Sequence, residues 1–158
     1  MIKQLALLFL LLFACESFAA DDVEIIGTWR LISYNTELQD GSLNRPLFGT
    51  NPIGFMIFTP DKRLMVVAEA ENRKAPERDE DRAGLLRTMF AYTGLYRIEG
   101  GKMIIRVDSS WNGVWNGTEQ VRFFKRDGNR LHFSTGWQPY ANLDGKIGRA
   151  TLVFEKAQ

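Results

Sequence analysis

Gly27-Thr28-Trp29 is the most informative motif of this chain for its fold. It opens a strand-like run over residues 27–36, and most of the sequence that follows has the pattern of strands joined by tight turns. The indole of Trp29 is large and needs burial, so we expect it to pack inside the domain that these strands build. The sequence therefore predicts an all-β domain in which Trp29 has a structural role.

Eight strands are expected, separated by turns and loops rich in glycine, proline, asparagine and aspartate. Their approximate ranges are 27–36, 54–59, 64–70, 91–98, 102–108, 119–126, 130–135 and 149–156. A short helix is expected over 79–90, where Leu85 and Met89 repeat at helical spacing and form an apolar face for the barrel opening or wall. Because most connections are hairpins, we predict an eight-stranded antiparallel up-and-down barrel with a packed interior or one small ligand.

The first 19 residues have the pattern of a secretory signal peptide. Lys3 precedes an apolar run at residues 5–14 that is too short to cross a bilayer, and Ser17-Phe18-Ala19 places small residues at the cleavage positions. We therefore expect a signal peptide at 1–19, a single domain at 20–158, and export to the periplasm.

A second interpretation of the leader stays open. Leu12-Phe13-Ala14-Cys15 resembles a lipobox, and Cys15 would then carry a lipid and anchor the protein to a membrane. Cys15 is the only cysteine, so the domain after the leader has no disulfide.

Charge and hydropathy exclude two classes of partner. The chain has 20 basic and 19 acidic residues, whereas nucleic acids and anionic membrane surfaces favour clustered positive charge. No segment after the leader approaches the ~20 apolar residues of a membrane-spanning helix. We expect no nucleic-acid partner and no transmembrane span.

Metal and cofactor chemistry finds no support in the sequence. His132 is the only histidine, which is too few for a typical multi-histidine metal site. We find no phosphate-binding glycine loop, nucleophile elbow or dinucleotide fingerprint. We therefore predict no metal and no cofactor, and assign no catalytic residue.

Two tryptophans occupy one loop, Trp111-Asn112-Gly113-Val114-Trp115. Exposing both indoles to water is unfavourable, so they fold back onto the barrel or line its mouth. Trp137 and Tyr140 lie in another long loop and would belong to the same rim.

Tyr92, Gly94 and Tyr96 share one face of a strand because side chains alternate with a period of two. If that face points inward, the glycine opens space and the two phenols offer hydrogen bonds to a ligand. The alternative is that the aromatic rings fill the barrel.

Two arginines have neighbours on the same strand face, Arg106 with Asp108 and Arg122 with Phe124. If these faces are interior, an arginine in an apolar cavity would bind a carboxylate. The alternative is that they face solvent. The candidate ligand-binding residues are thus Tyr92, Tyr96, Arg106, Trp111, Trp115, Arg122 and Phe124.

Motifs along the chain agree with the predicted strands. They are Gly27-Thr28-Trp29-Arg30-Leu31, Asn51-Pro52-Ile53-Gly54 with the turn Thr59-Pro60-Asp61, Tyr92-Thr93-Gly94-Leu95-Tyr96, Asn116-Gly117-Thr118-Glu119, Asp127-Gly128-Asn129 and Leu152-Val153-Phe154-Glu155. Together they resemble the bacterial and fungal lipocalin-like domain family of the calycin group, over about residues 25–156.

This resemblance implies a β-barrel that binds a small hydrophobic or amphipathic molecule. It also implies a structural role for Gly27 and Trp29 at the closed end of the barrel. A basic residue of the final strand, Arg149, would lie against the Trp29 ring in a cation–π contact.

Two other functions stay open at this point. One is a cofactor-free isomerase or cyclase, whose candidate residues are Arg106, Asp108, Arg122, Tyr96 and His132. The other is an envelope module that binds protein through the tryptophan loops.

Overall fold

The computed structural model describes residues 25–42, 44–139 and 145–158. The predictions made for the leader, for Cys15 and for Tyr140 concern residues outside these ranges.

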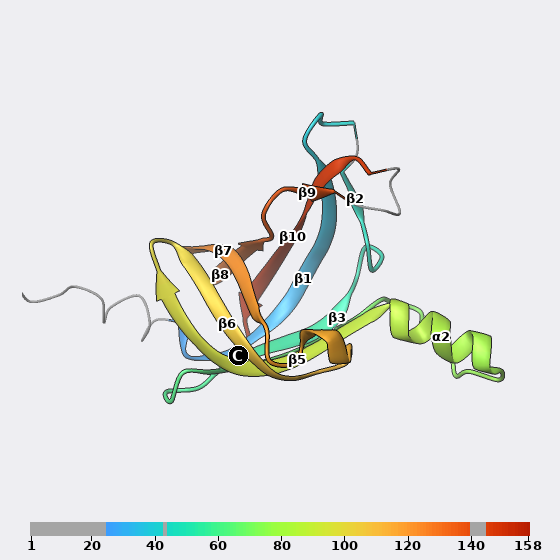
Figure 1. Ribbon diagram of the computed structural model, residues 1–158, viewed down its shortest axis with the longest axis horizontal. Helices are drawn as coiled ribbons and strands as arrows, with labels where there is room; N and C mark the ends of the chain where they lie inside the picture. The colour runs from blue at the N-terminus through green and yellow to red at the C-terminus, as the bar shows by residue number, and fades with distance from the viewer. Residues whose placement is uncertain (1–24, 43, 140–144) are drawn as a thin grey trace, which may run out of the picture.

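Eight antiparallel strands form a closed barrel, in which each strand pairs with the next one along the chain (Figure 1). In chain order they are β1 (Gly27–Leu38), β3 (Ile53–Phe58), β4 (Arg63–Glu69), β5 (Met89–Glu99), β6 (Lys102–Ser110), β7 (Glu119–Asp127), β8 (Arg130–Ser134) and β10 (Ile147–Lys156). The last of these, β10, pairs with both β8 and β1 and closes the barrel. Two short strands, β2 (Asn44–Pro46) and β9 (Gln138–Pro139), pair with β1 and β10. The predicted eight-stranded up-and-down barrel is confirmed.

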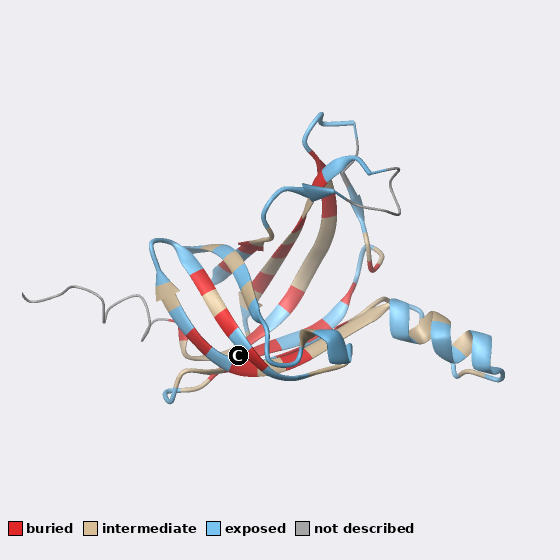
Figure 2. Cartoon of the chain, in the orientation of Figure 1, coloured by how far each residue is buried: buried red, intermediate tan, exposed pale blue. Residues whose placement is uncertain are grey.

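Burial alternates along the strands and separates an inner from an outer face (Figure 2). On β5 the buried positions include Tyr92 and Tyr96, so the face that the sequence grouped together points inward. On β10, Leu152 and Phe154 are buried and their neighbours are less so. The period of two in the sequence therefore grouped the correct residues on one face, and the structure shows that this face is the inner one.

The alternation changes phase once along β1. Trp29 is buried near its start and Thr36 near its end, although the two lie seven positions apart and strict alternation would place them on opposite faces. The pairing of β1 with β10 has an irregularity between Leu31 and Ser33, which inserts one extra residue into β1. As a result Tyr34 lines the interior, which strict alternation from Trp29 would not predict.

The helix is shorter than predicted and stands away from the barrel. Helix α2 (Asp79–Arg87) protrudes from the wall (Figure 1), and 53 % of Leu86 is exposed. The predicted short helix is confirmed with its start at Asp79, but it ends before Met89 and Phe90, which pair with β4 and begin β5, and the predicted packing of its apolar face on the barrel is wrong. No helix in the described part of the chain has the length and hydropathy to cross a membrane.

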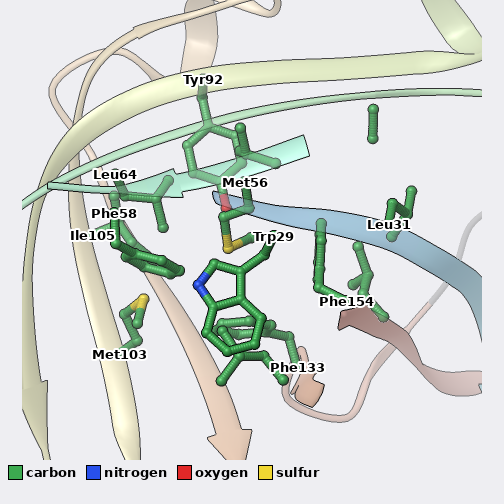
Figure 3. Packing of buried hydrophobic residues seen from close by; sticks show 14 of the residues in the cluster. Trp29, Leu31, Met56, Phe58, Leu64, Tyr92, Met103, Ile105, Phe133 and Phe154 are labelled. Carbon is green, nitrogen blue, oxygen red and sulfur yellow. The ribbon is translucent and has the colours of Figure 1, made fainter. Parts of the chain in front are cut away.

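Trp29 lies in the middle of the barrel core (Figure 3). Its ring is fully buried with Phe58 and Phe154, and its Nε1 donates a hydrogen bond to the Ile25 carbonyl oxygen at 2.7 Å. A buried indole needs such a partner, and Ile25, itself buried, supplies it. The segment before β1 thus helps to close one end of the barrel.

The cation beside Trp29 is Lys156 rather than the predicted Arg149. The Lys156 Nζ atom lies 4.6 Å from the centre of the Trp29 ring. Arg149 instead donates to Glu37 at 2.9 Å and lies 4.5 Å from the ring centre of Trp137. The reason is the antiparallel register of β1 and β10, which sets Trp29 opposite Lys156 and Glu37 opposite Arg149.

Gly27 makes room for this lysine. Its φ of +119° lies in a region that residues with side chains rarely adopt, and a Cβ there would lie 2.8 Å from the Lys156 Nζ. Without that Cβ, the ammonium group reaches the Ile26 carbonyl oxygen and donates a hydrogen bond to it.

Candidate functional site

The barrel contains a cavity of about 740 Å³. Its floor is made by buried side chains of the core that surrounds Trp29, among them Met56, Met103 and Phe154. Its rim comes from connecting segments, with Leu47 before β3 and Gln138 of β9. This volume lies in the range of pockets that hold one small organic molecule.

The loop after β6 places both of its tryptophans on the cavity. The rings of Trp111 and Trp115 meet edge to face at 4.9 Å, and Trp115 lies 5.5 Å from the ring of Tyr92. All three line the cavity. Of the two arrangements that the sequence left open, the structure shows tryptophans that line the mouth.

Hydrogen bonds hold this loop against the barrel. The Trp111 amide donates to the Ala91 carbonyl oxygen at 2.8 Å, and the Gly117 amide donates to Val107 at 2.8 Å. Between them, the Ser110 hydroxyl donates to the Asn116 side chain at 2.8 Å. The two Asn-Gly pairs allow the tight turns of this loop, and the backbone contacts fix where the indoles point.

Three aromatic residues that the sequence did not single out complete the wall. Tyr34 meets Phe48 at 4.7 Å and Phe90 at 5.6 Å, and Phe90 lies 6.3 Å from Trp111. The residues were missed for separate reasons. Phe48 lies between the predicted strands 27–36 and 54–59, in a segment expected to be a loop. Phe90 falls within the range predicted to be a helix. Tyr34 faces the cavity only because of the extra residue in β1.

Arg122 brings a positive charge into the cavity wall. Its guanidinium lies 5.6 Å from the Trp115 ring centre and donates to the Val121 carbonyl oxygen at 2.9 Å and to the Gln120 side chain at 3.3 Å. Burial raises the pKa of Tyr92 from its ordinary value, an effect that the nearby charge of Arg122 opposes. The Tyr92 phenol therefore stays neutral at ordinary pH and keeps its hydrogen.

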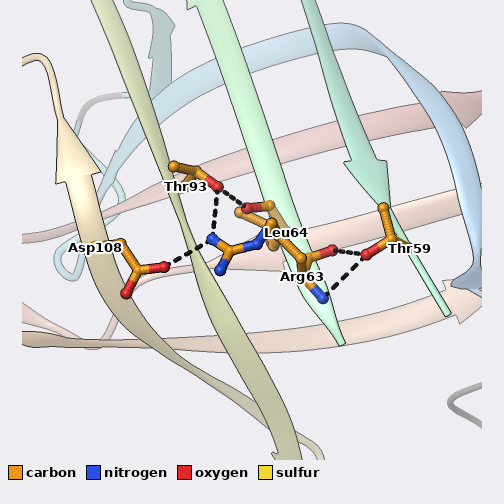
Figure 4. Close-up of polar contacts among 5 residues, drawn as sticks. All are labelled: Thr59, Arg63, Leu64, Thr93 and Asp108. Atoms are coloured by element: carbon orange, nitrogen blue, oxygen red, sulfur yellow. Dashed lines mark hydrogen bonds and ion pairs between the residues drawn. The ribbon is translucent and has the colours of Figure 1, made fainter. Parts of the chain in front are cut away.

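Arg106 lies outside the cavity. Its strand β6 points Met103, Ile105 and Val107 inward, so Arg106 falls on the exposed outer face. Asp108 is exposed too, and its carboxylate accepts a hydrogen bond from Arg63 at 2.7 Å (Figure 4). The interior cluster that the sequence allowed for these two residues does not form, and the alternative of a solvent-facing pair holds.

Tyr96 and Phe124 also lie outside the cavity lining. Tyr96 packs edge to face on Phe58 at 5.2 Å, close to the closed end. Phe124 stacks on Phe133 at 5.9 Å and borders a separate hollow of about 350 Å³ with Ile25. Of the seven candidate residues, the structure brings together Tyr92, Trp111, Trp115 and Arg122.

Gly94 allows two strands of the barrel wall to approach closely and does not line the cavity. A Cβ at this position would lie 2.0 Å from the Arg106 carbonyl oxygen, so β5 and β6 approach closely only because the residue is glycine. The pairing of β5 with β6 has an irregularity next to Gly94. The prediction that this glycine opens space for a ligand is wrong.

The residues proposed for a cofactor-free reaction do not converge. Such an enzyme needs them in one pocket, but Arg122 alone of the five lines the cavity. Arg106, Asp108 and His132 are on the outer face, and Tyr96 packs in the core. This arrangement gives no support to a reaction carried out by that set.

The sequence model of a lipocalin-like domain matches residues 26–157, nearly all of the described chain. No curated protein matches the chain. The match agrees with the closed eight-stranded barrel and with the motifs around Gly27 and Trp29. The chain belongs to the lipocalin-like domain family.

Proposed function

We propose that this lipocalin-like protein binds one small hydrophobic or amphipathic molecule inside its barrel. The observation that carries the proposal is the cavity of about 740 Å³, which has an apolar floor and an aromatic wall. A ligand that fills it would gain roughly 25 cal/mol for each Å² of apolar surface removed from water. Tyr34, Gln120 and Arg122 lie on the same lining and would orient a polar end.

Titration with N-phenyl-1-naphthylamine, a neutral apolar dye, tests the proposal. We expect a saturable rise in dye fluorescence with one site for each chain. Ala150 is buried and lines the cavity, so Ala150→Phe fills part of the space and should weaken dye binding by roughly tenfold or more, as expected when a ligand's apolar contacts are replaced by protein.

Val153→Phe is the matched control, because Val153 lies on the same strand and is not part of the cavity lining. It should leave dye binding unchanged, and circular dichroism should show that both variants fold. Absence of dye binding by the wild-type protein, or equal binding by Ala150→Phe, would contradict the proposal.

We also propose that the protein is exported to the periplasm, on the strength of the signal-peptide pattern at residues 1–19. Cell fractionation followed by mass spectrometry of the intact protein tests this. A mature chain that starts at Ala20 supports the soluble form, and a lipid-modified Cys15 supports the anchored form. An uncleaved chain in the cytoplasm would overturn both.

A further inference from the structure

The cavity has a one-sided charge. Among the described residues that line it, Arg87 and Arg122 are basic and none is acidic. The chain as a whole carries 20 basic and 19 acidic residues, so this imbalance belongs to the cavity and not to the composition. A wall of one sign attracts ligands of the other sign.

Arg122 differs from the paired arginines of the outer surface. Arg63 contacts Asp108 at 2.7 Å and Arg97 contacts Glu119 at 2.6 Å. Within the described part of the chain, the contacts of Arg122 are with neutral groups, namely a carbonyl oxygen, an amide oxygen, an indole ring and the Tyr92 phenol. A half-buried guanidinium without a carboxylate partner is a strong binder of oxyanions.

The groups around this guanidinium limit the shape of what it can bind. The Trp115 ring lies 5.6 Å below it, Trp111 meets that ring edge to face, and Tyr92 lies beside Trp115 at 5.5 Å. Flat ring faces next to a positive charge suit a flat apolar body that carries an acidic group.

We propose that the ligand is an organic acid, with its carboxylate or other oxyanion bound by Arg122 and its flat apolar body packed against Trp111 and Trp115. This rests on the proposed function, because it assigns the polar end of a ligand held in the same cavity. Tyr92 adds a neutral phenol that can donate a hydrogen bond to the acid, since burial keeps its proton in place.

Two dyes with the same ring system, one neutral and one anionic, separate the contribution of charge to binding from that of apolar contact. N-phenyl-1-naphthylamine is neutral, and 1-anilinonaphthalene-8-sulfonate carries one sulfonate on the same rings. In the wild-type protein the two dyes should compete for one site. Arg122→Met should weaken binding of the sulfonate dye by roughly 10- to 100-fold more than it weakens binding of the neutral dye, because only the sulfonate dye loses a hydrogen bond to a charged group.

Arg106→Met is the matched control, because it removes the same charge from the outer face of the neighbouring strand β6. It should leave the affinity of both dyes unchanged. Arg122→Lys keeps a positive charge and should retain part of the affinity for the sulfonate dye. Arg122→Gln is the second neutral variant, to be used if Arg122→Met does not fold.

The outcomes separate this inference from the proposed function. If the wild-type protein binds neither dye, the proposed function itself fails. If the neutral dye binds and a folded neutral variant of Arg122 keeps the full affinity for the sulfonate dye, the cavity stands and the organic-acid inference is overturned. An equal loss in Arg106→Met would also overturn it, because the effect would then come from net charge.

Discussion

The two ends of the barrel each carry a tryptophan beside a cation, yet the two pairs serve different purposes. At the closed end the Lys156 ammonium lies 4.6 Å from the Trp29 ring centre. At the open end the Arg122 guanidinium lies 5.6 Å from the Trp115 ring centre. Trp29 is fully buried, whereas Trp115 keeps part of its surface free on the cavity.

The difference comes from what covers each ring. Ile25 is buried beside Trp29 and accepts the hydrogen bond of its indole, so the Trp29 ring is fully covered and its N–H group is satisfied. Beside Trp115, the residues that the structure describes leave the cavity open. The same aromatic–cation pair thus stabilises the fold where neighbours fill the space, and offers a binding surface where they leave it open.

The largest expected effect is at the closed end. Trp29→Ala removes a buried ring from the middle of the core and should lower the free energy of unfolding by about 3–5 kcal/mol. Urea unfolding followed by circular dichroism measures this loss. If Trp115→Ala proved as destabilising as Trp29→Ala, the contrast between the two ends would be broken.

Gly94 lies on β5 between Tyr92, which faces the cavity, and Tyr96, which faces the closed end. Gly94→Ala sets a methyl group against the Arg106 carbonyl oxygen and should lower the free energy of unfolding by about 1–3 kcal/mol. Gly113→Ala is the control, because its Cβ meets open space. Equal unfolding midpoints for the two variants would contradict this account of the close strand approach.

At the open end the expected effect is on binding. Trp115→Ala should weaken binding of N-phenyl-1-naphthylamine by roughly tenfold, since a lost aromatic contact costs about 1 kcal/mol beyond its buried area. Trp137→Ala is the matched control, because Trp137 pairs with Arg149 and is not part of the cavity lining. The contrast between the ends would fail if Trp115→Ala bound the dye as the wild-type protein does.

The smallest expected effect is that Tyr92 and Lys156 change the free energy of unfolding in opposite directions as the pH rises. Burial raises the pKa of Tyr92 from 10.0, so the folded state holds a proton that the unfolded chain releases, and this contribution to stability is lost as the pH rises above about 10. Burial, together with the charge of Arg126, lowers the pKa of Lys156 from 10.5. Between the lowered pKa of Lys156 in the folded state and its ordinary value of 10.5, the unfolded chain binds more protons at Lys156 than the folded state does. The contribution of Lys156 to the free energy of unfolding therefore rises as the pH approaches 10.5.

Unfolding measured in steps between about pH 8 and pH 11, which brackets the ordinary values of both groups, separates the two contributions. Relative to the wild-type protein, Tyr92→Phe should remove the fall and Lys156→Met should remove the rise. Identical pH profiles for all three proteins would show that neither ring environment changes proton binding.

Local residue patterns in the sequence predicted the hairpins and the grouping of residues on strand faces. The predicted strands on either side of Glu99-Gly100-Gly101 and of Asp127-Gly128-Asn129 pair as hairpins, as expected. The shared face of Tyr92 and Tyr96 followed from a period of two within one strand, and the structure shows that this face points inward. The same reasoning did not say which end of the barrel each tyrosine faces, because that depends on how the barrel closes.

Pairing between distant strands was harder to foresee. Arg149 and Lys156 are both basic residues of β10, and only the register with β1 decides that Lys156 lies opposite Trp29. Arg106 and Arg122 face opposite sides of the wall, although both are arginines in strands with alternating burial. Phe90 joined β5 rather than the helix because pairing with β4 satisfies its backbone.

The sequence by itself determined the barrel, its strand order, the burial of Trp29 and the presence of aromatic residues in the loop after β6. These follow from alternation, turn residues and the need to bury large rings, all of which act over a few neighbouring residues. Only the tertiary structure decided that one extra residue in β1 turns Tyr34 inward, that Lys156 covers Trp29, and that Arg122 shares a cavity with Trp115. The first two outcomes depend on the register of β1 with β10, which joins residues more than a hundred positions apart in the chain, and the third depends on how the loop after β6 folds back beside β7.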